Sequence, residues 1–203
     1  MMLSRVLLLA WAALFTILAA GSAPAGQAAD QLRPAVDRVI RTLEDPALRS
    51  ASRAPERRRE IRAVTDAVFD WNEMAQRVLG RHWQGRTEGE RAEFVRLFTD
   101  LLERAYIGKI ERYSGEKVRF LGETVDGDQA TVRTALVTRQ GTEIPMDYRM
   151  ALRGARWLIY DVVIEHVGVV SNYRTQFDQI LRTASYQELV KRIKERSSQS
   201  SST

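Results

Sequence analysis

The chain has 203 residues, with 31 Lys and Arg against 26 Asp and Glu, a formal net charge of +5 and no cysteine. A chain of this length can bury about 70% of its unfolded surface, which predicts one folded domain and not a disordered segment. The lack of cysteine excludes disulfides, thiolate metal sites and cysteine nucleophiles.

Residues 1–28 have the pattern of a cleavable secretory signal peptide. Arg5 precedes the apolar stretch 6–20, and small residues follow it. The apolar stretch is shorter than the ~20 residues that a spanning helix needs. We therefore expect cleavage after Ala25 or Ala28 and a soluble exported protein.

Helical spacing dominates the first part of the predicted domain. Apolar residues recur at this spacing from Leu32 to Leu43, where Asp45-Pro46 predicts a stop. Pro55 predicts the start of a second helix, and a third is expected from Asp70 to Gly80.

The clearest helix start is at Thr87. Thr87 and Glu90 have the spacing of a capping box, and the apolar period that follows predicts a long helix to about Tyr113. Near the C-terminus, Ser185 and Glu188 have the same spacing and predict a final helix.

Past Gly115 the apolar period changes from helical to alternating. Strands are expected at 118–121, 130–138, 144–152 and 157–164, and the last of these is apolar on both faces, so we expect it to be covered on both. Simple alternation also places Asp161 and Glu165 on the same face as Trp157 and Ile159.

The order of these elements predicts an α+β fold in which helices cover a curved, four-stranded antiparallel sheet. We expect a signal peptide at 1–28, one domain at 29–196 and a disordered Ser-rich tail at 197–203. Within the domain, 29–114 is mainly helical, 115–166 forms the sheet and 167–196 forms C-terminal helices.

Motifs of the common nucleotide-binding, zinc-protease and hydrolase sites are missing from the sequence. The two histidines, His82 and His166, are far apart and predict no metal site. Asp161, Glu165 and His166 lie close together in sequence, so one hypothesis is a small exported acid-base enzyme. The other interpretation is that the two carboxylates hold the strand-to-helix corner through hydrogen bonds.

Six arginines lie between Arg49 and Arg62, with only two glutamates among them. Aromatic residues for base stacking are missing there, and an exported protein rarely meets nucleic acid, so we expect no nucleic-acid partner. An acidic docking partner or an anionic membrane fits better, and a solvated helix face is the alternative.

The chain resembles the MlaC-type periplasmic phospholipid shuttles, also called the toluene-tolerance family. The resemblance spans roughly the whole mature chain, and no single motif in it is diagnostic. The matching residues are Asn72-Glu73-Met74-Ala75, Val78-Leu79-Gly80, Trp83, Thr87 to Glu90, Phe94, Leu101-Leu102, Tyr106, Tyr113 to Glu116, Ile144 to Tyr148, Trp157, Tyr160 to Val162, Glu165, Ser171 to Arg174 and Gln176-Phe177.

The resemblance implies a monomeric carrier without catalytic residues, metal or cofactor, which holds the acyl chains of a phospholipid in an apolar cleft between sheet and helices. It implies shuttling between an outer-membrane lipoprotein complex and an inner-membrane ABC transporter complex, which maintains outer-membrane lipid asymmetry. A hopanoid or other polycyclic lipid is the alternative cargo. The large apolar residues expected to line the cleft are Met74, Val78, Phe98, Leu101, Tyr106, Met146, Tyr148, Met150, Trp157, Ile159, Val163, Val167, Tyr173 and Phe177.

The sequence departs from this family at one visible place. Where the family usually reads Glu-Gly-Val-Ser after the fourth strand, this chain reads Glu165-His166-Val167-Gly168. Histidine in place of glycine reduces backbone freedom at the predicted mouth of the cleft and adds a titratable group.

Overall fold

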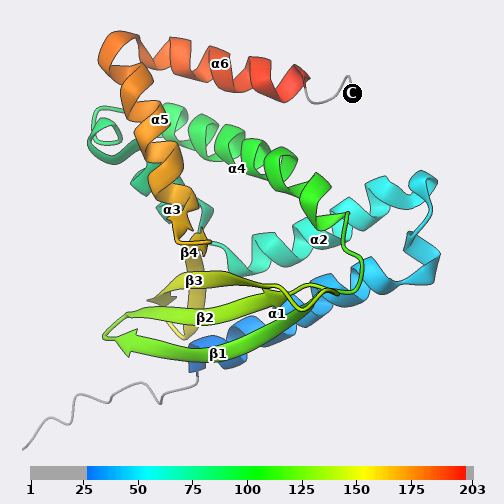
Figure 1. Cartoon of the computed structure of the whole chain (residues 1–203). Helices are drawn as coiled ribbons and strands as arrows, with labels where there is room; N and C mark the ends of the chain where they lie inside the picture. Colours follow the sequence, from blue (N-terminus) through cyan, green and yellow to red (C-terminus); the bar gives the residue numbers. More distant parts are fainter. Residues whose placement is uncertain (1–26, 200–203) are drawn as a thin grey trace, which may run out of the picture.

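The computed structural model describes residues 27–199 and confirms the α+β class (Figure 1). The predicted signal peptide, apart from its last two residues, lies outside the described residues, and so does the end of the predicted tail at 200–203. The helices are α1 (Gln27–Glu44), η1 (Pro46–Leu48), η2 (Ala51–Arg53), α2 (Ala54–Val68), α3 (Trp71–Leu79), η3 (Gly80–His82), α4 (Glu88–Ile110), α5 (Val169–Thr183) and α6 (Tyr186–Gln199).

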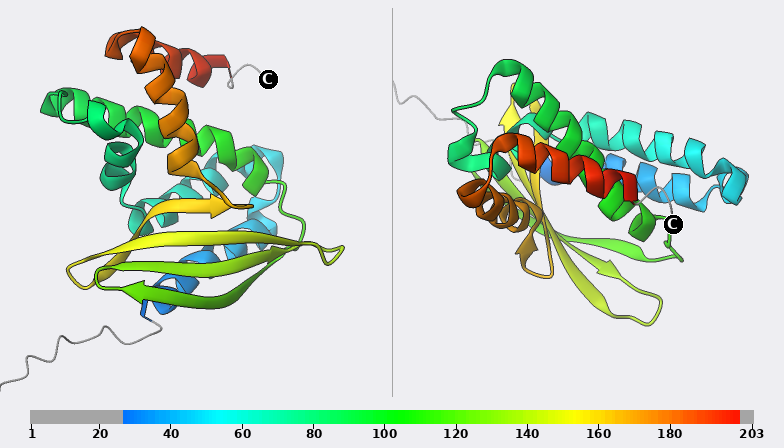
Figure 2. Two further views of the ribbon diagram at one scale, coloured as in Figure 1. Left: turned by 60° about the vertical axis from the view of Figure 1, so that its left-hand side comes forward. Right: turned by 90° about the horizontal axis from the view of Figure 1, so that it is seen from above.

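The sheet contains five strands where the sequence predicted four. They are β1 (Lys117–Asp126), β2 (Gln129–Val137), β3 (Glu143–Arg153), β4 (Arg156–Ile164) and β5 (Val167–Gly168), in sequential order and all antiparallel. The extra strand has only two residues, too few to show an alternating pattern in the sequence. It turns the chain back along β4 before α5 begins, and the whole sheet curves (Figure 2).

The predicted caps set the helix boundaries. The Asp70 carboxylate accepts a hydrogen bond from the Glu73 backbone N at 3.0 Å, and α3 ends at Gly80, whose φ is 54°. At α4 the Thr87 hydroxyl accepts from the Glu90 backbone N at 3.2 Å while the Glu90 carboxylate accepts from the Thr87 backbone N at 2.9 Å. This reciprocal pair is the predicted capping box.

The helices and the sheet enclose two separate hydrophobic cores. The helical core is formed by α3, α4, α5 and α6, with Ala151 and Tyr160 from the sheet. The sheet core lies between α1 and one face of the sheet, where Ala28 and Leu32 meet Met150, Trp157 and Ile159. Because β4 contributes to both cores, the expectation that this strand is covered on both faces is confirmed.

Ala28 is fully buried in the sheet core, and α1 begins before the predicted domain start at residue 29. Cleavage after Ala28 would remove this buried contact and cleavage after Ala25 would keep it, and the cleavage position stays a prediction. At the other end, α6 continues to Gln199, three residues into the predicted tail.

Asp161 does not share a face with Ile159, so the alternation expected for β4 is wrong at this point. Met150 pairs with Ile159 and Arg149 pairs with Asp161, so Tyr160 is an extra residue on β4. A β-bulge of this kind places two successive residues on one side and reverses the parity of the strand. Neighbouring residues of β3 point to opposite faces, so Asp161 lies on the face opposite Ile159.

Within residues 27–199, none of the helices combines the length and the apolar composition that a bilayer crossing requires.

Candidate functional site

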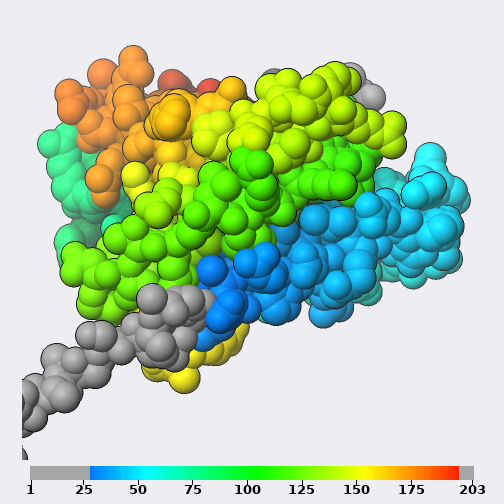
Figure 3. All heavy atoms as spheres, turned by 60° about the horizontal axis from the view of Figure 1, so that its bottom comes forward, coloured from blue at the N-terminus to red at the C-terminus, as the bar shows by residue number. Residues whose placement is uncertain are grey.

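The two faces of the sheet differ sharply in chemistry. The outer face of β1 to β3 carries exposed arginines, among them Arg119, Arg133 and Arg149, and Figure 3 shows these strands forming an open surface beside α1. The inner face, which we define as the face that packs against α1, carries apolar side chains in rows across the strands.

Only half of the inner face belongs to a fully buried core. Towards the start of α1, the inner-face residues Ala130, Val132, Met150, Trp157 and Ile159 are all buried in the sheet core. Towards the opposite end of the strands, the side chains are half-buried instead. These residues, which we name the apolar lane, are Val118, Phe120, Leu136, Ile144, Met146, Tyr148, Val162 and Ile164.

The register of the strands makes the lane continuous. Val118 is opposite Leu136, which is opposite Ile144, and this forms the last row. In the next row Met146 is opposite Ile164 on one side and Thr134 on the other. Thr134 is the buried polar residue of this row, and its hydroxyl donates to the Met146 carbonyl at 2.6 Å. Because this hydroxyl is bonded to the backbone, the row presents an apolar surface.

Helix α1 extends along the inner face beyond the sheet core. Leu32 and Val36 pack in or against that core, and the half-buried Val39, Ile40 and Leu43 continue the same helical stripe. Helix α4 packs against α3 and α6, and its ribbon stands above the strands in Figure 1. The lane is thus bordered by the apolar stripe of α1, and of its residues only Phe120, Tyr148 and Val162 pack against the edge of a core.

Burial raises the pKa of two tyrosines, one in the lane and one at the edge of the helical core. Tyr148 lies in the lane, its hydroxyl donates to the Met146 Sδ at 3.1 Å, and burial raises the pKa of Tyr148 to about 12. Burial, and to a lesser degree the charge of Asp161, also raises the pKa of Tyr106 on α4. Both phenols stay neutral at physiological pH, so Tyr148 adds a polar hydroxyl to the lane without adding charge.

The structure divides the fourteen predicted cleft residues among six places. Met146 and Tyr148 lie in the lane, while Met150, Trp157 and Ile159 lie on the same face but deep in the sheet core. Tyr106 is half-buried at the edge of the helical core. Six predicted residues lie within that core and are buried, namely Met74, Val78, Phe98, Leu101, Tyr173 and Phe177.

The aromatic members of that group pack against one another. Phe98 meets Tyr173 and Phe177 edge to face, with centroids 5.5 and 6.2 Å apart. These contacts are those of a solid helix-helix core. Phe98 and Phe177 therefore lie in the part of the molecule that holds α4 and α5 together.

The last two predicted residues lie elsewhere. Val163 is opposite Asp147, which places it on the outer side of the sheet. Val167 pairs with Ile164 in β5 and keeps 58% of its surface exposed, which is unusual for a large apolar side chain. Val167 therefore lies beside the lane residue Ile164. Its role at the mouth of a cleft stays a prediction.

Asp161 holds the strand-to-helix corner, as the structural interpretation of the sequence expected. Its carboxylate accepts from the Val170 backbone N at 2.9 Å and from Arg149 at 3.2 Å, and the residue is 2% exposed. Burial raises the pKa of Asp161 although both hydrogen bonds oppose that shift. A Cβ on Gly168 would lie 2.9 Å from Asp161 Oδ2, so a residue without a side chain is required there.

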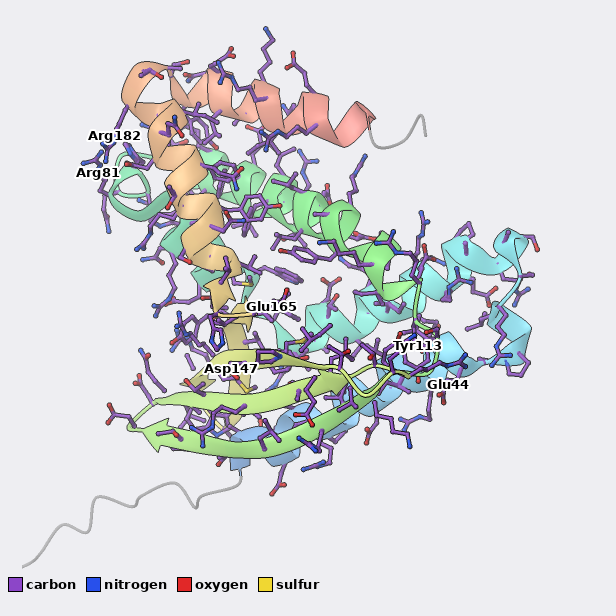
Figure 4. All side chains as sticks on the ribbon, viewed as in Figure 1. Glu44, Arg81, Tyr113, Asp147, Glu165 and Arg182 are labelled. Atoms are coloured by element: carbon purple, nitrogen blue, oxygen red, sulfur yellow. The ribbon has the colours of Figure 1, made fainter. Side chains whose placement is uncertain are left out.

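Glu165 and His166 form the two-residue turn between β4 and β5. Their φ values are 47° and 68°, in the left-handed region that the β-hairpin turn of this length requires. Both side chains are exposed, and among the described contacts neither bonds to Asp161. Figure 4 shows Glu165 at this corner. The geometry offers no assembled acid-base pair in this part of the chain.

Most of the predicted arginine run is neutralised within the protein. Arg57 and Arg58 both bind the Glu111 carboxylate, at 2.7 and 2.8 Å, and Arg62 contacts Asp66 and Glu103. The Arg57 pair is largely buried, with 12% of each side chain exposed. These ion pairs tie α2 to the end of α4, which leaves only part of the run available to a partner.

No histidine of the described region takes part in a metal-ligand cluster, and the groups that could hold a metal are lacking between residues 27 and 199. His82 is half-buried, and its Nε2 lies 3.0 Å from the Asp178 carboxylate. This contact, followed by the bond from Arg182, lowers the pKa of Asp178.

Six lane residues were not among the predicted site residues, namely Val118, Phe120, Leu136, Ile144, Val162 and Ile164. Val162 and Ile164 lie opposite the predicted residues Tyr148 and Met146, and the others belong to the same rows or to a neighbouring row of the inner face. Strand alternation counted from Met146 would have found Ile144, and pairing with β2 and β4 would have found Leu136 and Ile164. The pairing itself is not visible in one sequence.

Comparison with known families settles what kind of protein carries this lane. The family model described as MlaC protein matches residues 33–195. The chain belongs to the MlaC family. No curated protein matches the sequence.

A solved structure has the same fold. It is a phospholipid-binding protein from Ralstonia solanacearum in complex with a phospholipid, with a TM-score of 0.76 and 24% sequence identity. The match covers 86% of this chain and 98% of the other chain. At this identity the likeness shows a shared fold.

Proposed function

We propose that this MlaC protein is a periplasmic phospholipid carrier and that the apolar lane contacts the acyl chains of its cargo. The observation that carries the proposal is the lane itself. Eight half-buried side chains form one apolar surface, of which Phe120, Tyr148 and Val162 pack against the edge of a core and the other five belong to neither core. Membership of the MlaC family and the phospholipid in the solved neighbour support this cargo.

A carrier of this kind has to replace water around the acyl chains. Each methylene moved out of water gains about 0.8 kcal/mol, so a chain of about fifteen methylenes gains on the order of 12 kcal/mol. An apolar surface between sheet and helix can supply this contact without a charged ligand set. Binding needs no catalytic group, cofactor or metal.

The carrier function extends to transport between membranes. We infer that the protein acts as a monomer and exchanges phospholipid with an outer-membrane lipoprotein complex and an inner-membrane ABC transporter complex, which maintains outer-membrane lipid asymmetry. The predicted signal peptide and membership of the MlaC family support the periplasmic location.

Extraction of the exported protein into organic solvent, followed by lipid mass spectrometry, tests the cargo. We expect phospholipid near one molecule per protein. A bound polycyclic lipid would show that the alternative cargo is correct. An empty protein that takes up no lipid from vesicles would refute the carrier function.

A pair of variants ties the cargo to the lane. Met146→Glu places a carboxylate among apolar side chains, where desolvation costs several kcal/mol, so we expect little bound lipid. Thr124→Glu places the same group on the outer face of the same sheet, beside Arg133, and should leave the lipid content unchanged. Equal lipid content in both variants would show that the lane does not contact the lipid.

A further inference from the structure

A polar pocket lies where the apolar lane ends. It encloses about 470 Å³ between the end of α1, the start of α2, the segment after α4 and the hairpin between β2 and β3. Figure 4 shows two of its residues, Glu44 and Tyr113, beside each other at the end of the sheet. The charged or polar lining residues used below are Glu44, Arg49, Arg57, Glu111, Tyr113 and Arg139.

The pocket joins the last row of the lane through the chain itself. Gly115 of the lining lies three residues before Val118, and Arg139 lies three residues after Leu136. At about 3.3 Å per residue along a strand, the pocket begins within roughly 10 Å of that row. Leu43 of the lining belongs to α1, whose apolar stripe borders the lane.

Internal contacts satisfy both carboxylates of the pocket. Glu111 accepts from Arg57 at 2.7 Å, and Glu44 accepts from the Tyr113 hydroxyl at 2.8 Å. Burial, followed by the contact with Glu44, raises the pKa of Tyr113 to about 12, so this phenol keeps its proton. Glu44 and Glu111 therefore already have hydrogen-bond partners other than Arg49 and Arg139.

Arg49 and Arg139 are the cations that remain. In the described part of the chain, neither has a carboxylate within ion-pair distance. Arg139 contacts the Gly115 region and contributes to the lowered pKa of Glu116, but Glu116 is already held by the Ser114 backbone N at 2.7 Å. Two guanidinium groups thus border a cavity at the end of an apolar surface.

We propose that Arg49 and Arg139 bind the phosphate of the phospholipid while its acyl chains lie along the lane. Guanidinium groups bind phosphate oxygens through paired, charge-assisted hydrogen bonds. The order along the protein, apolar lane and then cationic pocket, matches the order along a phospholipid. This inference rests on the proposed function and adds a recognition site for the headgroup.

The test compares two lipids that share their acyl chains, dioleoyl phosphatidylglycerol and dioleoylglycerol, on delipidated exported protein. We expect the wild type to prefer the phospholipid. The double variant Arg49→Gln/Arg139→Gln should lose about tenfold of that preference and keep its affinity for dioleoylglycerol, because only the contact with phosphate is removed. The matched control is Arg81→Gln/Arg182→Gln, which removes the same charge from the other basic pocket, between η3 and α5.

Each other outcome contradicts a distinct statement. Equal affinity of the wild type for both lipids, or an equal loss of preference in the control, overturns the phosphate site and leaves the carrier intact. Inorganic phosphate that binds at Arg49 and Arg139 without competing with phosphatidylglycerol assigns the pocket to a free anion and overturns the proposal. A wild type that binds neither lipid refutes the carrier function and this site with it.

Discussion

His166 has a backbone conformation that costs a non-glycine residue free energy. Its φ of 68° lies in the left-handed region, where a Cβ costs about 1 kcal/mol, and the turn joins β4 to β5. His166→Gly should therefore raise the free energy of unfolding by about 1 kcal/mol in urea denaturation. His166→Ala keeps the Cβ and should bring no gain. A similar gain in both variants would show that the imidazole, and not the backbone, is the destabilising feature.

The raised pKa of Asp161 predicts a defined pH dependence of stability. The folded state binds this proton more tightly than the unfolded state, whose Asp pKa is about 3.9. The Asp161 contribution to the free energy of unfolding therefore decreases as the pH rises from about 3.9 through the raised folded value, and is constant above it.

Asp161→Asn isolates this effect, because the amide oxygen can still accept from the Val170 backbone N. We expect the difference in unfolding free energy, wild type minus variant, to decrease as the pH rises through that window. A difference that stays flat, or that changes in the opposite direction, would show that Arg149 fully compensates the buried charge.

The ion pairs of α2 make a prediction about how the helices are joined. Arg57 donates to the Leu48 carbonyl and to Glu111, so it links η1, α2 and the end of α4. Arg57→Ala leaves a largely buried carboxylate with one partner fewer, and we expect a loss of about 3 kcal/mol in unfolding free energy. Arg59→Ala, an exposed neighbour on the same helix, should change it by less than about 0.5 kcal/mol.

Thermal or urea denaturation of both variants measures this difference. Similar stabilities would mean that the arginine run is a solvated helix face throughout. In that case the whole run would be available to steer the carrier toward an acidic partner.

Elements whose ends are marked by local chemistry could be predicted from the sequence. Asp70, Gly80, Thr87 and Glu90 bound α3 and α4 as expected, because caps act within four residues. The Tyr160 bulge and the two-residue β5 could not be predicted, since both depend on pairing between strands. The bulge alone reversed the predicted face of Asp161.

The candidate site could be predicted only in part, for a reason that concerns the whole molecule. Phe98 and Phe177 have the same apolar character as Met146 and Tyr148, but they lie in the helical core, not in the lane. Periodicity shows which residues face inward, and it does not show which inward surfaces meet. Sheet register and the position of α4 decide that, and both require the folded structure.

The central claim is that phospholipid acyl chains lie along the apolar lane, and photocrosslinking measures this most directly. A phospholipid with a diazirine in one acyl chain is loaded into the exported protein, irradiated, and mapped by peptide mass spectrometry. We predict labels on the lane, with Met146 and Ile164 among them, and on the facing stripe of α1. Labels confined to the helical core around Phe98 and Phe177, or to the outer face around Arg149, would contradict it.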